Sequence, residues 1–158
     1  MWQRIQTLYL ALIAILSIVM CFQTTAYMMA ESTGAIYQFK FPGVVTASGD
    51  TYMGMFFLYL LLFIIAALAV LTIFMYKKRK LQIRLTILNI LLMVGYYALL
   101  FWHVFVAKAR LESEGIAVEW HLNIAFCFQL VNIVLAVMAI RAILKDEALV
   151  RSADRLRS

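Results

Sequence analysis

The sequence predicts an all-α integral membrane protein, in which four transmembrane helices form a bundle with both termini in the cytoplasm and a small β-hairpin cap on the extracytoplasmic side. The composition, the spacing of the charged residues and the distribution of lysine and arginine predict this fold. Of the 158 residues, 66% are hydrophobic and 14% are charged, and the mean hydropathy is +0.94. Soluble domains are about 45–50% apolar and about 25% charged. This composition excludes a soluble enzyme, a disordered segment and a disulfide scaffold.

Four long uncharged stretches separate the charged residues, and each can cross a membrane once. The shortest, between Glu119 and Arg141, has 21 residues, and the longest have 26. About 20 helical residues cross the hydrocarbon core, and helices are required because lipid cannot satisfy exposed backbone groups. We predict spans at 8–28, 55–76, 85–107 and 121–140, outer loops at 30–54 and 108–120, an inner loop at 77–84, and a helical tail at 141–158.

Lysine and arginine are concentrated on one side of these predicted spans. With the N-terminus inside, 11 of the 14 basic residues fall in cytoplasmic segments. Those on the other side are Lys40, Lys108 and Arg110. Short cytoplasmic loops carry an excess of lysine and arginine in membrane proteins, so both termini are expected in the cytoplasm. The same asymmetry accounts for the pI near 9.5 without a nucleic-acid partner.

The outer loops contain alternating apolar segments that predict β-structure. Residues 35–41 are rich in aromatic side chains, and the turn signal Pro42-Gly43 and the apolar run 44–46 follow them. This order is typical of a β-hairpin. Residues 116–120 alternate as well and offer a third strand. A small cap is therefore expected on the outer face.

The two ends of the chain resemble a known family. The sequence opens on MWQRIQTLYL and closes, over residues 145–157, on KDEALVRSADRLR. Both strings are similar to those of an uncharacterised family of bacterial inner-membrane proteins, domain of unknown function 4293, and the resemblance extends over essentially the whole chain. It implies a four-helix protein of the bacterial inner membrane. It supplies no activity and no functional residue.

Polar residues inside the predicted spans indicate contacts between helices, because polar groups are costly in lipid. In the third span, Asn89, Tyr96 and His103 are seven residues apart. In the fourth span, Gln129 and Asn132 belong to a heptad stripe that also contains Ala125, Ala136 and Ala139. Small and polar stripes of this kind let membrane helices pack closely. We predict an interhelical polar seam of Asn89, Tyr96, His103, Gln129 and Asn132. A proton or solute path along the same face is the alternative interpretation.

The two histidines follow tryptophans near the outer ends of two spans. His103 and His121 could converge on a haem iron, or bind a metal ion together with Glu119. The chain has no C-x-x-C-H motif, and histidine beside tryptophan is also typical of the membrane interface. We therefore expect no cofactor and retain His103, His121 and Glu119 as candidate metal-binding residues. Cys21 and Cys127 lie within spans, and no disulfide is predicted.

Two charged segments are predicted on the cytoplasmic side. The first is a basic cluster that sets the topology and attracts anionic lipids: Lys77, Lys78, Arg79, Lys80 and Arg84. The second is the tail, which contains no glycine or proline and continues an apolar side beyond Arg141. Its candidate residues for docking a membrane or cytoplasmic protein are Leu149, Arg151, Arg155 and Leu156.

No nucleotide-binding, hydrolase or metalloprotease motif occurs in the sequence. We therefore predict a non-catalytic membrane protein, an accessory or scaffold subunit of a membrane assembly. One alternative is a small transporter or channel component that uses the polar face of the third helix. Another is a haem- or quinone-linked redox subunit.

Overall fold

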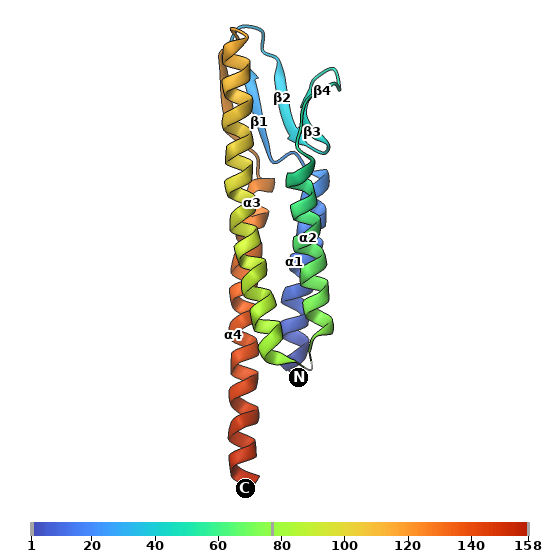
Figure 1. Ribbon diagram of the computed structural model, residues 1–158, viewed down its shortest axis with the longest axis vertical. Coiled ribbons are helices and arrows are strands. Elements are labelled where there is room, and N and C mark those ends of the chain that lie inside the picture. The colour runs from blue at the N-terminus through green and yellow to red at the C-terminus, as the bar shows by residue number, and fades with distance from the viewer. Residues whose placement is uncertain (1, 77, 158) are drawn as a thin grey trace.

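The chain folds into an elongated bundle of helices with a β-sheet at one end (Figure 1). The computed structural model describes residues 2–76 and 78–157, with side chains for 5–76, 78–149 and 152. The helices are α1 (Trp2–Phe22), α2 (Phe56–Phe74), α3 (Arg79–Ser113) and α4 (Ala125–Arg157). The strands are β1 (Ala26–Ala30), β2 (Ile36–Lys40), β3 (Gly43–Thr46), β4 (Thr51–Gly54) and β5 (Val118–Leu122). The predicted helical membrane fold is thus accompanied by a larger β-structure than the expected hairpin.

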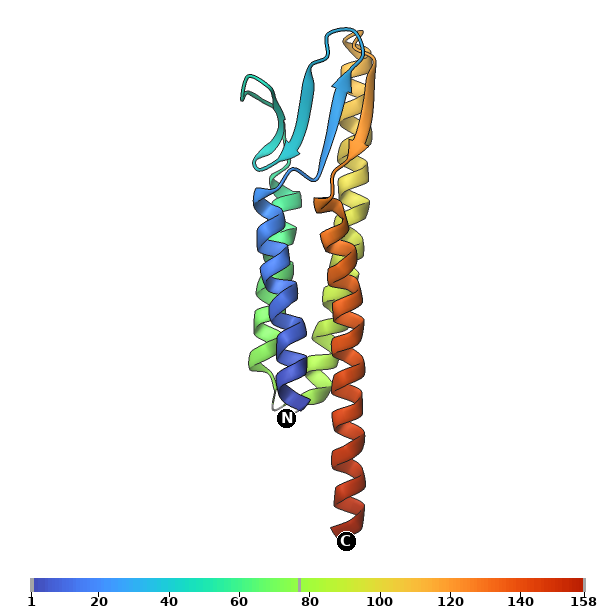
Figure 2. The same cartoon turned by 180° about the vertical axis from the view of Figure 1, so that it is seen from behind.

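All four helices of the described residues are long and apolar enough to cross a membrane. They differ in length, since α1 and α2 have 21 and 19 residues whereas α3 and α4 have 35 and 33. At a rise of 1.5 Å per residue, α3 is about 50 Å long, which exceeds the roughly 30 Å hydrocarbon core. Each long helix therefore extends past the bundle at one end: α3 beside the sheet and α4 at the opposite end (Figures 1 and 2).

Within the bundle, α1 packs most extensively against α4 and α2, and α3 packs against α2 and α4. The buried positions of α1 and α4 alternate in steps of three and four. On α1 the stripe is Gln6, Leu10, Ile13, Ser17 and Met20, and Ala14 next to Ile13 is buried as well. On α4 they are Ala125, Gln129, Asn132, Ala136, Ala139 and Ile143. This heptad spacing is that of left-handed helix packing, and the small residues on α4 permit the close approach.

The sheet has five antiparallel strands in the order β4-β3-β2-β1-β5. The predicted hairpin is present as β2 and β3, with Lys40 opposite Gly43. The predicted third strand is present as β5, and it pairs with β1 rather than with the hairpin. Gly43 also lies so close to the Met53 carbonyl oxygen that a Cβ there would overlap it. Strands β1 and β4 were not predicted.

The ends of three predicted spans differ from the structure. Helix α1 ends at Phe22, and the last residues of the predicted span 8–28 belong to β1. Helix α4 begins at Ala125, because residues 118–122 pair with β1 before the helix starts. Helix α3 extends beyond 85–107 at both ends. The predicted spans were bounded by charged residues. An apolar strand such as Ala26–Ala30 lengthens an uncharged stretch although it is not part of the helix, so the predicted ends were displaced.

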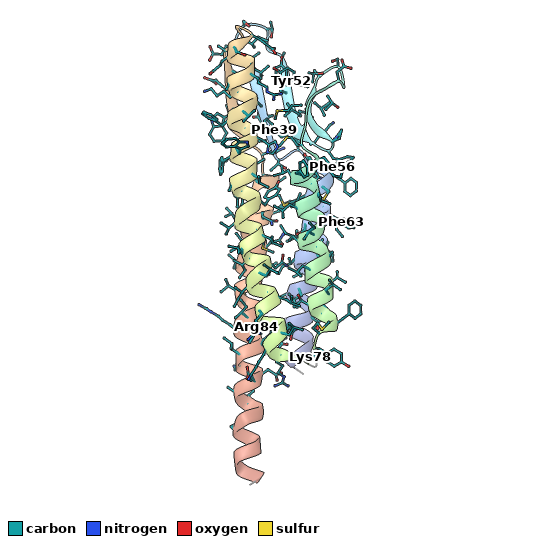
Figure 3. The ribbon with its side chains drawn as sticks, viewed as in Figure 1. Phe39, Tyr52, Phe56, Phe63, Lys78 and Arg84 are labelled. Carbon is teal, nitrogen blue, oxygen red and sulfur yellow. The ribbon has the colours of Figure 1, made fainter. Side chains whose placement is uncertain are left out.

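The sheet is fixed to the part of α3 that extends beyond the bundle. Buried residues of α3, Leu100, Val104, Ala107 and Leu111, belong to the same hydrophobic core as Met28, Phe39, Val44 and Val118 of the sheet. At the far edge of the sheet, the Tyr52 hydroxyl donates a 2.8 Å hydrogen bond to Glu114 Oε1 at the end of α3. Because β4 and β5 are opposite edges, these contacts hold both sides of the sheet to one helix. Phe39 and Tyr52 lie in this region in Figure 3.

Candidate functional site

The polar residues of α4 are buried against α1. Asn132 Nδ2 donates hydrogen bonds to Ser17 Oγ at 3.1 Å and to Gln129 Oε1 at 3.0 Å. All three side chains are fully buried. A hydrogen bond between membrane helices contributes about 0.6 kcal/mol on average, so the trio favours one register of α4 against α1.

The polar residues of α3 do not continue this trio into one seam. Asn89 Nδ2 donates a 3.3 Å hydrogen bond to the Ile65 carbonyl oxygen of α2. A hydrogen bond that does join α3 to α4 comes from the Tyr97 hydroxyl to the Phe126 carbonyl oxygen at 2.7 Å. The predicted seam residues therefore do not all join the third helix to the fourth. Asn89 and Asn132 bond to α2 and α1 instead, and Tyr97, next to the predicted Tyr96, was missed.

Tyr96 is buried without a hydrogen bond for its hydroxyl group. The Thr25 hydroxyl is also buried and lies near that of Tyr96, but the two are too poorly aligned for a regular hydrogen bond. Further buried side-chain atoms of this kind among the described residues are Gln6 Nε2, Asn89 Oδ1, Gln129 Nε2 and Asn132 Oδ1. A buried polar atom without a partner costs free energy.

His103 lies outside both groups of buried polar residues. Its Nδ1 lies 2.7 Å from the Leu99 carbonyl oxygen one turn earlier in α3, and its side chain is half-buried. The buried positions of α3 repeat every eleven residues, as in 89, 93, 96, 100, 104, 107 and 111. An eleven-residue repeat has a period of about 3.67, not 3.5. Extrapolating a step of seven from Tyr96 therefore places His103 one residue away from the buried Val104.

The histidines have separate surroundings. The His121 ring stacks on Tyr27 with centroids 5.2 Å apart, and its Nε2 lies 3.8 Å from Glu119 Oε2. His103 instead contacts its own helix. Among the residues that the structure describes, no group of three or more histidine, cysteine or acidic side chains is placed to hold a metal ion. Cys21 and Cys127 are both free.

A hollow between α3 and β5, which we call the sheet-end groove, was not predicted. Its volume is about 580 Å³, and its lining is Phe101, Val104, Phe105, Lys108, Ala109, Glu112 and Trp120. Rings of Phe101 and Trp120 meet edge to face, with centroids 6.3 Å apart. A second hollow of about 440 Å³ shares Lys108, Glu112 and Trp120 and adds Glu31, Glu119 and His121. The lining residues of α3 follow a helical spacing, at positions 101, 105, 108 and 112. The sequence of α3 alone does not indicate that β5 lies beside this stripe, so the groove could not be predicted.

The basic cluster lies at the opposite end, where α4 leaves the bundle (Figure 3). Lys78, Lys80 and Arg84 are exposed, and Lys77 lies outside the described residues. Arg79 differs from them, because its Nη2 lies 3.0 Å from Asp146 Oδ2 and its Nη1 donates to the Asp146 carbonyl oxygen at 3.2 Å. One member of the predicted cluster thus binds Asp146 near the point at which α4 projects from the bundle.

The tail continues α4 without interruption to Arg157. Leu149 is 49% exposed. The side chains of the other predicted docking residues, Arg151, Arg155 and Leu156, lie outside the described residues. Figure 2 shows this segment projecting past the ends of the other helices.

The comparisons with known proteins identify one family. The pattern of the family described as Domain of unknown function (DUF4293) matches residues 2–156. No curated protein and no solved structure matches the chain.

Proposed function

We propose that this chain, which belongs to the family Domain of unknown function (DUF4293), is a non-catalytic accessory or scaffold subunit of a membrane assembly. The observation that carries the proposal is the projection of α4 beyond the bundle (Figures 1 and 2). From Asp146 to Arg157 the helix has 12 residues, about 18 Å at 1.5 Å per residue. An isolated helix of this length is marginal in water, so a helical projection suits a segment that docks against another protein.

The base of the projection is held by Arg79. Two contacts from its guanidinium group, to the side chain and to the backbone of Asp146, fix the direction in which α4 leaves the bundle. A preorganised helix loses less conformational freedom on binding than a flexible tail. The exposed Leu149 provides an apolar contact on this helix, and Leu156 follows it by seven residues in the sequence.

The orientation that we propose places both termini in the cytoplasm of a bacterium, with the protein in the inner membrane. The excess of lysine and arginine at the tail end supports it. In this orientation Lys78, Lys80 and Arg84 face the inner leaflet, where each contributes about 1 kcal/mol of attraction to anionic lipids. Reporter fusions at Ser158 and after Arg79 should report the cytoplasm, and fusions at Gly49 and Gly115 the opposite side. A fusion at Ser158 that reports the opposite side contradicts this orientation.

The docking function is tested by replacing Leu149 and Leu156 with aspartate in the full chain. Apolar anchors carry most of the energy when a helix docks in a groove, so proteins cross-linked in cells and co-purified in mild detergent should be lost. Membrane insertion and thermal stability should persist, because Leu149 is exposed and lies beyond the bundle. A matched control replaces Ala148, which is exposed and about 100° around the helix from Leu149, with aspartate and should retain the partners. If the test and control variants retain the same partners, the tail is only a solvated extension and the proposal fails.

A further inference from the structure

The sheet-end groove changes from apolar to charged along α3. Phe101 and Phe105, 43% and 69% exposed, are followed on the same side of the helix by Lys108 and Glu112. The Phe101 ring lies 6.0 Å from that of Phe126 in the first turn of α4. Phe101 therefore marks the level at which the bundle ends and the sheet begins. The end of the groove near the bundle is apolar and the end near the sheet is charged. A lipid molecule in the adjacent leaflet has the same order, with its acyl chains toward the bundle and its headgroup toward the sheet.

The position of Lys108 suits a headgroup at this level. It follows Phe101 by seven residues, a rise of about 10 Å. The headgroup layer is about 5–8 Å thick, so the Lys108 backbone lies just beyond that layer. Side chains of a helix tilt toward its N-terminus, which for α3 is the membrane side. The Lys108 Nζ lies beside Glu112, one turn farther from the bundle, and a long basic side chain can reach back to the interface when it binds a headgroup.

The charges beside the groove are mixed. Lys108 Nζ lies 3.6 Å from Glu112 Oε1, and these side chains are 40% and 51% exposed. The adjoining hollow adds Glu31 and Glu119. A purely anionic headgroup would find one lysine and several carboxylates there. A headgroup with a phosphate and a primary ammonium group would find a partner for each charge.

We propose that the sheet-end groove binds a phospholipid with a phosphoethanolamine headgroup from the leaflet at the sheet end. Lys108 binds the phosphate, Glu112 accepts a hydrogen bond from the ammonium group, and Phe101 and Phe105 contact the first part of the acyl chains. The site does not depend on the docking function of the tail, and it is the same in either orientation of the protein in the membrane.

Binding is measured on the full chain, purified in detergent and freed of lipid. Replacing Trp2 and Trp102 with phenylalanine leaves Trp120, which lines the groove, as the only tryptophan of the chain. Its fluorescence is followed during titration with short-chain phosphatidylethanolamine, phosphatidylcholine and phosphatidylglycerol that carry the same acyl chains. We expect saturable binding of phosphatidylethanolamine, about tenfold tighter than that of the other two lipids, which corresponds to about one charged contact. Equal affinity for phosphatidylglycerol would overturn the proposed headgroup.

Variants of the lining residues test the assigned contacts. Lys108→Ala and Glu112→Gln should each weaken phosphatidylethanolamine binding about tenfold, and Lys108→Arg should retain it. Ala109→Phe fills the groove and should abolish binding, whereas the control Ala98→Phe, at an exposed alanine of the same helix outside the groove, should not. Thermal unfolding of each variant identifies any that fail to fold, and native mass spectrometry of retained lipid gives a second measurement. Unchanged binding in folded Lys108→Ala and Ala109→Phe proteins would overturn the site.

Discussion

The guanidinium group of Arg79, the first residue of α3, binds both the side chain and the backbone carbonyl group of Asp146 of α4. Its Nη2 lies 3.0 Å from Asp146 Oδ2, and its Nη1 donates to the carbonyl oxygen at 3.2 Å. The side chains are only 26% and 16% exposed. This contact joins the turn between α2 and α3 to the point at which α4 projects. It connects two residues that are 67 positions apart in the sequence, at the tail end of the bundle.

Removing this contact should destabilise the bundle modestly. Exposed ion pairs contribute about 0.2–1 kcal/mol, and removing one partner of a buried pair costs more because the other charge is left unpaired. A double-mutant cycle of Arg79→Ala and Asp146→Ala should therefore give a coupling of about 1 kcal/mol. Thermal unfolding in detergent measures it, with Lys80→Ala, at an exposed neighbour, as the control. If the two single changes are simply additive, the pair contributes nothing to stability.

The buried polar groups should differ in their importance. Asn132→Ala removes the bonds to Ser17 and Gln129 and should cost about 1–2 kcal/mol of unfolding free energy, near the upper values for membrane helices. Tyr96→Phe removes a hydroxyl group that is poorly aligned with Thr25 and should cost less than Asn132→Ala. Chemical or thermal unfolding of both variants makes the comparison. A larger loss in Tyr96→Phe would show that its hydroxyl group has a partner.

The close contact between α1 and α4 depends on alanine. Ala136 is fully buried, so Ala136→Leu places a branched side chain in a packed interface, where overpacking costs about 1–3 kcal/mol. Ala98→Leu, at an exposed position of α3, is the matched control and should change the melting temperature little. Equal losses in the two variants would remove the evidence for close packing at Ala136.

Sequence patterns predicted the elements whose signals are local. The heptad stripe of α4 correctly places Ala125, Gln129, Asn132, Ala136 and Ala139 on its buried side, because a regular repeat defines a helix face without knowledge of the partner. The same reasoning failed at His103, where the buried side of α3 follows a different period.

Contacts between distant segments carried no such signal. The strand Ala26–Ala30 is as apolar as the helix before it, and its role depends on pairing with β2 and β5. The sheet-end groove likewise exists only once β5 lies beside α3. The bond from Tyr52 to Glu114 joins residues 62 apart, and neither residue stands out in the sequence.

That bond should make the attachment of the sheet sensitive to alkaline pH. Burial, the hydrogen bond to Glu114 and the Glu114 charge raise the pKa of Tyr52 above its ordinary value of 10. A raised pKa means that the neutral phenol is favoured in the folded protein, so its contribution is present below about pH 10. It is lost as the pH rises through the pKa of the folded state.

The Tyr52→Phe variant isolates this effect. At pH 8 it should be less stable than the parent by about 0.5–1 kcal/mol, as expected for one partly exposed hydrogen bond, and the difference should shrink above pH 10 as the unfolded parent ionises. The difference in tyrosinate absorbance between the two proteins gives the titration of Tyr52. Glu114→Gln should move that titration to lower pH, because it removes the negative charge beside the phenol. If Tyr52 titrates at the same pH with and without this charge, the hydroxyl group does not bond to Glu114, and the sheet is held to α3 by its hydrophobic core alone.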